Sequence, residues 1–224
     1  MTICLVTDRR RLAASATDAA AARCLLAQVR HAAAAGVDLI QIRERDLEAA
    51  ALAALVREVL ATTRGTSTRV VVNDRVDVAI ACGAHGVHLR AGSMPAAVVR
   101  RLAPTRFVIG VSIHGASELA AAGGADYAIA GTVFPSESKP NDPRLLGVDG
   151  LRGIVREAAV PVLAIGGMTL DRMAEVAAAG AAGVAAIGLF MRAGESAHEG
   201  CRARDLDDIV VNARARFDSA ISRS

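Results

Sequence analysis

The chain has 224 residues, 53% of them hydrophobic, and its 26 basic and 23 acidic side chains leave a formal net charge of +3. This length can bury one large core, while the interspersed charges and the 2% aromatic content argue against a nucleic-acid-binding protein. No apolar stretch reaches the roughly 18 residues that a membrane-spanning helix needs, so no membrane segment is expected.

Eight short apolar runs follow one another along the chain, and each is followed by a stretch rich in helix-forming residues. Their β-branched and nearly all-apolar composition is typical of parallel strands that are covered on both faces. The predicted strands are Ile3–Thr7, Asp38–Arg43, Arg69–Asn73, Gly86–Leu89, Phe107–Val111, Tyr127–Ala130, Pro161–Ile165 and Val184–Ile187.

Helices are predicted between the strands, for example over Thr17–Ala35, Leu47–Thr62 and Leu170–Ala179, with Gly36 and Gly180 as C′ caps. Eight β/α units in this length predict a (β/α)8 TIM barrel, an α/β fold, with a single domain over residues 1–224. Alternation alone also allows a doubly wound sheet. No GxGxxG sequence follows the first strand, which argues against the dinucleotide-binding form of that fold.

The N-terminal segment and the cysteines indicate the cellular location. Met1–Asp8 has no basic region followed by a long apolar run, so we interpret it as a strand rather than a signal peptide. Cys4, Cys24, Cys82 and Cys201 are dispersed without CxxC spacing. This spacing favours reduced thiols over a disulfide framework or a zinc site, and we expect a cytoplasmic protein.

The second predicted strand ends in an unusually polar sequence, at the barrel face where the catalytic residues of TIM barrels lie. Gln41, Arg43 and Arg45 alternate, so they are expected to project together toward the barrel mouth. Polar groups on an apolar strand cost free energy unless they are satisfied, which favours a functional role. A cluster of surface salt bridges is the alternative, and it suits Glu44 and Asp46 better.

The third and fifth strands also end in polar residues. Asn73 would present an amide to the mouth, and Asp74 would either bind Mg²⁺ or cap the next helix. Ser112 and His114 share one face of the fifth strand, and histidine is the side chain that titrates near neutral pH. His88, within the fourth strand, fits a satisfied core histidine. No acidic residue has a spacing that indicates a Ser/His/Asp triad, which disfavours hydrolase chemistry.

The ends of the seventh and eighth strands predict a phosphate pocket. Gly166 and Gly167 precede a helix, and Ile187 and Gly188 end the eighth strand. Paired glycines expose backbone N–H groups to an anion at a helix N-terminus, and barrels often bind phosphate with these two loops. A tight turn would explain one of these glycines more readily than the whole arrangement.

Lys139 is the only lysine among the 26 basic side chains. Codon bias toward arginine explains the scarcity of lysine, but a lysine retained under that bias indicates a role for a compact ammonium group. Ser136 and Ser138 precede it at alternate positions in the loop after the sixth strand. Two hydroxyls and an ammonium on such a loop favour a phosphorylated ligand.

Seven segments, taken in order at these strand ends, resemble the thiamin phosphate synthase/TenI family over almost the whole chain. They are residues 41–46 (QIRERD), 72–79 (VNDRVDVA), 86–89 (GVHL), 110–114 (GVSIH), 125–140 (ADYAIAGTVFPSESKP), 164–168 (AIGGM) and 183–185 (GVA). The resemblance implies a barrel enzyme of thiamin biosynthesis, a transferase that couples hydroxymethylpyrimidine diphosphate to a thiazole phosphate and releases diphosphate. It also implies Mg²⁺ as the cofactor and small phosphorylated substrates as partners, and it is compatible with a homo-oligomer.

The resemblance further implies a role for each matching residue. The groups expected to hold the diphosphate are Arg43, Arg45, Asn73 and Lys139, with Asp74 as the Mg²⁺ ligand. The side chains expected to orient the pyrimidine are Gln41 and Ser136, and those expected near the reacting atoms are Ser112 and Ser138. The backbone expected to hold the thiazole phosphate belongs to Gly166, Gly167, Ile187 and Gly188.

Two departures from the synthase pattern favour another branch of the family. The synthases usually have lysine at the position of Arg45, and an acidic second Mg²⁺ ligand where this chain has Arg90–Met94 without a carboxylate. Both features resemble the TenI branch, whose thiazole tautomerases use a histidine that matches His114. Asp74 and the residues 136–139 are what a diphosphate site would retain. A synthase is therefore the leading expectation, with a metal-independent tautomerase and a non-catalytic, phosphate-binding regulatory barrel as alternatives.

Overall fold

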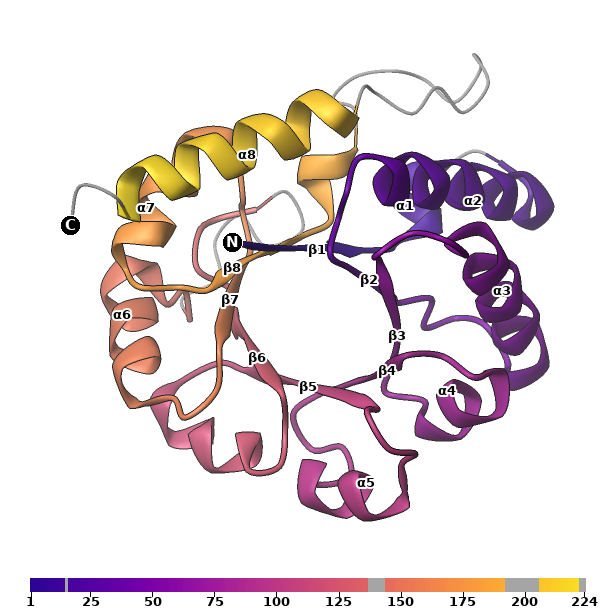
Figure 1. The fold of residues 1–224 in the computed structure, drawn as a ribbon, viewed down its shortest axis with the longest axis horizontal. Helices are drawn as coiled ribbons and strands as arrows, with labels where there is room; N and C mark the ends of the chain where they lie inside the picture. The colour runs from indigo at the N-terminus through magenta and orange to yellow at the C-terminus, as the bar shows by residue number, and fades with distance from the viewer. Residues whose placement is uncertain (15, 137–143, 192–205, 222–224) are drawn as a thin grey trace.

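The computed structural model describes residues 1–14, 16–136, 144–191 and 206–221. Its strands form a closed parallel barrel in the order β1 to β8, with helices around the outside (Figure 1). The strands are β1 (Thr2–Val6), β2 (Leu39–Ile42), β3 (Arg69–Asn73), β4 (Gly86–Leu89), β5 (Val108–Ile113), β6 (Tyr127–Gly131), β7 (Val162–Ile165) and β8 (Gly183–Ala186). β8 closes the ring on β1 through a register that runs from Thr2↔Gly183 to Leu5↔Ala186. The predicted (β/α)8 fold is confirmed.

The outer layer consists of α-helices and short 3₁₀ helices (η). They are α1 (Arg9–Leu12), α2 (Asp18–Ala34), α3 (Ala49–Thr62), α4 (Val76–Cys82), α5 (Ala96–Leu102), η1 (Ala116–Ala122), α6 (Gly147–Glu157), η2 (Leu170–Arg172), α7 (Met173–Ala178), η3 (Gly188–Phe190) and α8 (Leu206–Ile221). Gly36 and Gly180 follow α2 and α7 with φ of +80° and +85°, the left-handed conformation of a C′ cap, as predicted. The predicted helix over Leu170–Ala179 is divided into η2 and α7.

Two apolar clusters form the core. The larger cluster lies between the strands and the surrounding helices and includes Leu25, Ile40 and Val59. The smaller cluster fills the barrel with side chains from every second position of the strands, such as Val71 and Leu163. This alternation follows from the period of two along a strand, so the polar residues that share the inward face project from the ends of the strands into the mouth.

The C-terminal helix α8 fastens the barrel at the end opposite the mouth. Arg214 donates hydrogen bonds to the backbone oxygens of Met1 (2.7 Å) and Gly36 (2.8 Å) and to Asp38 Oδ2 (2.9 Å). Asp38 Oδ2 in turn accepts from the backbone N–H of Ile3 at 2.7 Å. One guanidinium therefore joins α8 to the first two β/α units.

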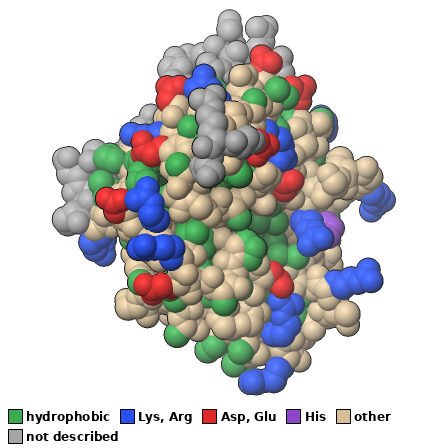
Figure 2. Space-filling model, turned by 60° about the vertical axis from the view of Figure 1, so that its left-hand side comes forward, with side chains coloured by type: hydrophobic (Ala, Val, Ile, Leu, Met, Phe, Trp, Pro, Cys, Tyr) green, Lys and Arg blue, Asp and Glu red, His purple; other side chains and the backbone are tan. Residues whose placement is uncertain are grey.

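The cysteines differ in part from the expectation of reduced thiols. Cys4 is buried and Cys82 is partly buried, and both are free thiols, but Cys24 is disulfide-bonded, so the expectation was wrong for Cys24. Cys201 lies outside the described residues. Among the described helices, none combines the length and the apolar character required to cross a bilayer. Side chains of both charges are interspersed on the face shown in Figure 2.

Candidate active site at the barrel mouth

The structure brings Gln41 and Asn73 together inside the mouth, as the sequence predicts. Gln41, on β2, is only 3% exposed, and its Nε2 donates to Oδ1 of Asn73 at the end of β3, 3.0 Å away. The two side chains belong to neighbouring strands, so their amides lie side by side above the apolar interior. They form a polar floor at the bottom of the mouth, directly above the apolar interior.

Ser112, on β5, lies beside that floor and contacts a buried histidine. His88 Nε2 is 2.9 Å from Ser112 Oγ, and His88 Nδ1 is 3.2 Å from the hydroxyl of Tyr127. Burial lowers the pKa of His88 to about 3, so its ring is neutral at physiological pH. His88 is thus a satisfied core histidine, as the sequence indicates, and it connects the core to the predicted site.

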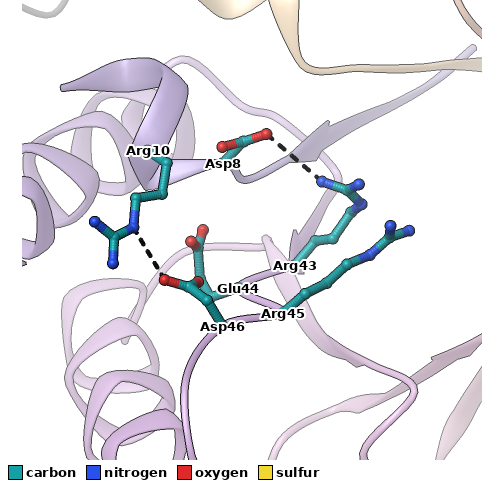
Figure 3. A pocket seen from close by; sticks show the side chains of 6 residues that line it. All are labelled: Asp8, Arg10, Arg43, Glu44, Arg45 and Asp46. Carbon is teal, nitrogen blue, oxygen red and sulfur yellow. Dashed lines mark hydrogen bonds and ion pairs between the residues drawn. The ribbon is translucent and has the colours of Figure 1, made fainter. Parts of the chain in front are cut away.

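Arg43 and Arg45 line a pocket of about 380 Å³ and extend in the same direction (Figure 3). Arg43 is half-buried, and burial, together with the neighbouring charge of Arg45, lowers its pKa. Its Nη1 lies 3.6 Å from Asp8 Oδ2. Arg45 is exposed and makes no ion pair with any described residue. The pocket is lined by three cations, Arg10, Arg43 and Arg45, and by the carboxylates of Asp8, Glu44 and Asp46. The role of the two arginines in binding an anion stays a prediction.

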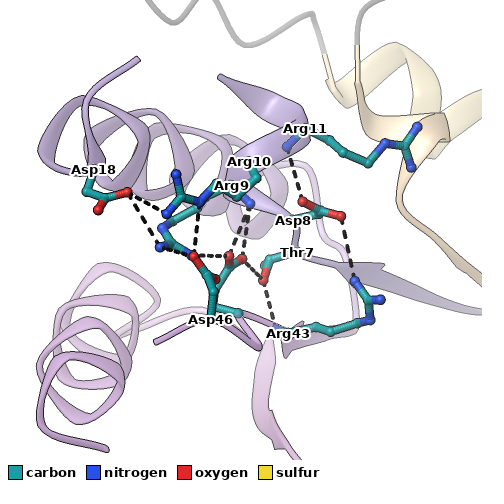
Figure 4. Close-up of polar contacts among 9 residues, drawn as sticks. Thr7, Asp8, Arg9, Arg10, Arg11, Asp18, Arg43 and Asp46 are labelled. Carbon is teal, nitrogen blue, oxygen red and sulfur yellow. Dashed lines mark hydrogen bonds and ion pairs between the residues drawn. The ribbon is translucent and has the colours of Figure 1, made fainter. Parts of the chain in front are cut away.

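The acids beside these arginines are held by a separate network (Figure 4). Glu44 is 5% exposed, so its interpretation as a surface residue was wrong. Its carboxylate accepts from Thr7 Oγ1 at 2.7 Å and from Arg9 Nη1 at 3.0 Å. Arg9, itself 2% exposed, also donates to both oxygens of Asp46, at 2.6 and 2.7 Å. This hydrogen bonding with Arg9 holds the pKa of Asp46 well below its usual range.

The network also fixes the backbone that carries the pocket arginines. Thr7 Oγ1 accepts from the backbone N–H of Arg43 at 2.9 Å while it donates to Glu44. The loop after β1 is therefore tied to the loop after β2 at the base of the pocket. Sequence reasoning missed Arg9. The available signal is the run Arg9–Arg11 immediately after a strand, where a barrel places functional loops.

Asp74 does not cap α4, so one of its two predicted roles, that of helix cap, was wrong. The N-cap position belongs to Arg75 and has no side-chain hydrogen bond, and Asp74 itself adopts a left-handed φ of 64°. Its carboxylate contacts the hydroxyl of Ser93 and accepts from Arg90 Nε at 2.7 Å, with Arg90 Nη2 at 2.5 Å. Burial opposes ionisation, but the bonds from Ser93 and Arg90 prevail and lower the pKa of Asp74.

The donor set around Asp74 is sparse for a metal. Among the described residues, no group of three or more His, Cys, Asp or Glu side chains could hold an ion. Mg²⁺ is commonly bound by one or two carboxylates together with substrate phosphates. Asp74 fits the one-carboxylate form of that arrangement, provided that Arg90 gives way.

Gly166 and Gly167 bring the loop after β7 against the loop after β6. Their φ angles are 103° and 60°, and a Cβ on either would overlap Thr132 or Pro135. Both positions thus require glycine, for the turn and for the close approach together. Arg172 donates a hydrogen bond to the Gly167 carbonyl, and its guanidinium carbon lies over the Phe134 ring, 4.4 Å from the ring centre.

Ile187 and Gly188 lie at the start of η3 after β8, next to the β7 loop because β7 and β8 are paired. The first N–H groups of such a turn have no partner within the turn. The backbone donors predicted to bind phosphate therefore lie in the loops that follow two neighbouring strands, β7 and β8. Arg172 is a nearby cation that sequence reasoning missed.

The remaining predicted residues are at the rim of the mouth or beyond the described residues. His114 directly follows β5 and is exposed, and Glu118 Oε2 is 3.1 Å from its Nδ1 and 2.9 Å from its backbone nitrogen. Ser136 is at the end of the described part of the β6 loop. Ser138 and Lys139 lie outside the described residues.

Known proteins resemble this chain in both sequence and fold. The family model described as thiamine monophosphate synthase matches residues 4–190. A thiamine-phosphate synthase of Methanoregula boonei is 43% identical over 190 residues, which cover 84% of this chain and 87% of that protein. One of Moorella thermoacetica is 37% identical over 190 residues, with 84% and 89% covered. The solved thiamine phosphate pyrophosphorylase of Pyrococcus furiosus superposes with a TM-score of 0.77 at 30% identity, covering 98% of this chain and 96% of that one.

Proposed function

We propose, because this chain belongs to the thiamine monophosphate synthase family, that it couples hydroxymethylpyrimidine diphosphate to a thiazole phosphate and releases diphosphate. The observation that carries the proposal is that Gln41 and Asn73 are hydrogen-bonded where β2 and β3 end, and that Arg43 and Arg45, which directly follow β2, line a pocket. The proposal includes a single domain over residues 1–224 and a cytoplasmic location. It involves no nucleic acid or membrane partner, and it is compatible with a homo-oligomer.

The leaving diphosphate is the group that this site must stabilise. Negative charge develops on its oxygens as the bond to the pyrimidine breaks, and fixed cations lower the energy of that transition state. Arg43 and Arg45 supply two such cations, and Lys139 would supply a third. Arg43 is partly withdrawn from water, which strengthens its interaction with an anion.

The polar floor suits the organic part of the substrate. Gln41 and Asn73 offer amide donors and acceptors to the pyrimidine, and Ser136 would complete this set. Ser112 and Ser138 would lie near the reacting atoms. The thiazole phosphate would bind the backbone at Gly166, Gly167, Ile187 and Gly188, where Arg172 adds a nearby positive charge.

Mg²⁺ is part of the proposal, with Asp74 as its protein ligand. When bound, the ion would neutralise charge on the diphosphate. In the free protein, Arg90 and Ser93 engage the Asp74 carboxylate, so a metal would have to displace a resident cation. We therefore expect coupling to require more Mg²⁺ than is usual for the family.

The tautomerase alternative has one observation in its favour. His114 is exposed at the rim and paired with Glu118, an arrangement in which an imidazole can exchange protons without a metal. Such an enzyme would need neither Asp74 nor a diphosphate pocket.

Three variants separate the two functions. In a synthase, Asp74→Ala and Lys139→Ala should abolish formation of thiamin phosphate, because both act on the diphosphate. In a tautomerase, His114→Ala should remove isomerisation of the thiazole carboxylate phosphate by about 10²–10⁴-fold and Asp74→Ala should leave it intact. Asp77→Ala, in an exposed ion pair with Arg75 on the adjacent helix, is the matched control.

Both products should be measured with and without Mg²⁺. Metal-dependent coupling that is lost in the first two variants supports the proposal. Metal-independent isomerisation with no coupling product would defeat it.

A further inference from the structure

A hydrogen-bonded chain crosses the barrel interior from the core to the mouth, through Tyr127, His88 and Ser112. The three residues come from β6, β4 and β5. His88 and Tyr127 are both paired in register with Gly110 on the intervening strand. A Cβ at Gly110 would overlap the Tyr127 ring, so the missing side chain is what lets the tyrosine reach across β5 to the histidine.

The neutral His88 ring can be protonated on only one nitrogen, so the chain has two possible directions. In the first direction, Tyr127 donates to Nδ1, and the Nε2–H of His88 donates to Ser112. In the second, Ser112 donates to Nε2, and the Nδ1–H of His88 donates to Tyr127. The two directions differ only in the positions of the hydrogen atoms. The surroundings of the Tyr127 hydroxyl show which direction is favoured.

Tyr127 is 8% exposed and packs in the apolar barrel cluster with Val108, Ile129 and Leu163. His88 is the one hydrogen-bond partner of its hydroxyl among the described residues. In the second direction the tyrosine hydrogen would be buried without an acceptor, which is costly. In the first direction, the Tyr127 hydroxyl and the His88 N–H each have an acceptor.

We propose that Tyr127 and His88 are positioning residues that hold Ser112 as a hydrogen-bond acceptor on its inner side. The hydroxyl hydrogen of Ser112 is then free to point into the mouth. This inference deepens the proposed function and rests on it in one respect: the group that receives this hydrogen is an oxygen of the departing diphosphate, on which charge develops. Ser112 itself lies half-buried at the mouth, so its outer side is open to a ligand.

The tautomer of His88 can be measured directly, without any substrate. Long-range ¹H–¹⁵N correlation spectra of the ¹⁵N-labelled full chain distinguish Nδ1–H from Nε2–H rings, and His88→Gln identifies the His88 signals by their loss. We expect Nε2–H in the wild type and a shift toward Nδ1–H in Tyr127→Phe, which keeps the ring but removes the donor. An Nδ1–H ring in the wild type, or an unchanged tautomer in Tyr127→Phe, would overturn the inference.

A double-mutant cycle tests the link to Ser112. Tyr127→Phe should lower kcat for coupling about tenfold with KM little changed, and Ser112→Ala should lower it further. If the tyrosine acts through the serine, Tyr127→Phe should have no additional effect in the Ser112→Ala background. Independent losses that multiply would indicate a merely structural role and would overturn the inference.

The two proposals can fail separately. If the wild type forms no coupling product at any Mg²⁺ concentration, the proposed function fails, and the tautomer spectra alone then decide the direction of the chain. If coupling occurs but the spectra show Nδ1–H, the function stands and the positioning role is wrong.

Discussion

The network at the base of the arginine pocket predicts an unequal response to losing either member of its buried ion pair. Glu44 has a single cationic partner among the described residues, Arg9, whereas Arg9 also binds Asp46 through two hydrogen bonds. Removing the arginine leaves Glu44 buried without a counter-ion, but removing the glutamate charge leaves Arg9 still paired. The arginine should therefore matter more.

The magnitudes follow from burial. Both side chains of the pair are 2% exposed, so Arg9→Met should lower the free energy of unfolding by about 3–5 kcal/mol, the usual cost of an uncompensated buried charge. Glu44→Gln keeps an oxygen for Thr7 and loses mainly one charge-assisted bond, so about 1.5–3 kcal/mol is expected. The double variant Arg9→Met/Glu44→Gln should be more stable than Arg9→Met alone, because no buried charge remains.

Urea unfolding followed by far-UV circular dichroism measures these three values. Arg75→Ala is the control, since its partner Asp77 is exposed and such pairs contribute about 0.2–1 kcal/mol. The reasoning is refuted if Glu44→Gln costs as much as Arg9→Met, or if the double variant is the least stable of the three.

Two further predictions concern protonation and the metal. Burial lowers the pKa of His88 to about 3, whereas an unfolded histidine titrates near about 6.5. Between these two pH values His88 is protonated in the unfolded state but not in the folded state. Stability should then fall as the pH falls below about 6.5, by about 2 kcal/mol at pH 5, and urea titrations of His88→Gln should lack this component. Arg90→Ala should free the Asp74 carboxylate and tighten Mn²⁺ binding several-fold in calorimetry of the substrate-free protein. Equal affinity in Arg90→Ala and wild type would show that Arg90 does not compete with the metal.

Much of the fold could be predicted because its signals are local. The β-branched runs and the cap glycines Gly36 and Gly180 each follow from a few neighbouring residues, and the observed strand ends differ from the predicted ones by at most two positions. Helix length was less predictable. The predicted helix Leu170–Ala179 begins as a 3₁₀ turn shortly after Gly167, which lies against the β6 loop.

The position of a site residue was predictable where it depends on a place at a strand end, as for Gln41, Asn73 and Arg43. The contacts of a site residue were not predictable where they depend on a distant partner. Glu44 is buried because Arg9, 35 residues away, supplies its counter-ion. No local pattern contains that pairing. The fate of Asp74 likewise depends on Arg90, 16 positions further along the chain.

The attachment of α8 has a consequence for how the chain is made. Arg214 contacts the backbone of Met1 across a separation of 213 residues, and β1 pairs with β8. During synthesis, the first strand therefore emerges long before the partners that cover its outer edge and its lower end. An uncovered strand edge is a template for pairing with other chains, and contacts so distant in sequence form slowly. A chain that has not yet reached β8 therefore exposes the outer edge of β1, and α8 later adds the hydrogen bond of Arg214 at the lower end of that strand.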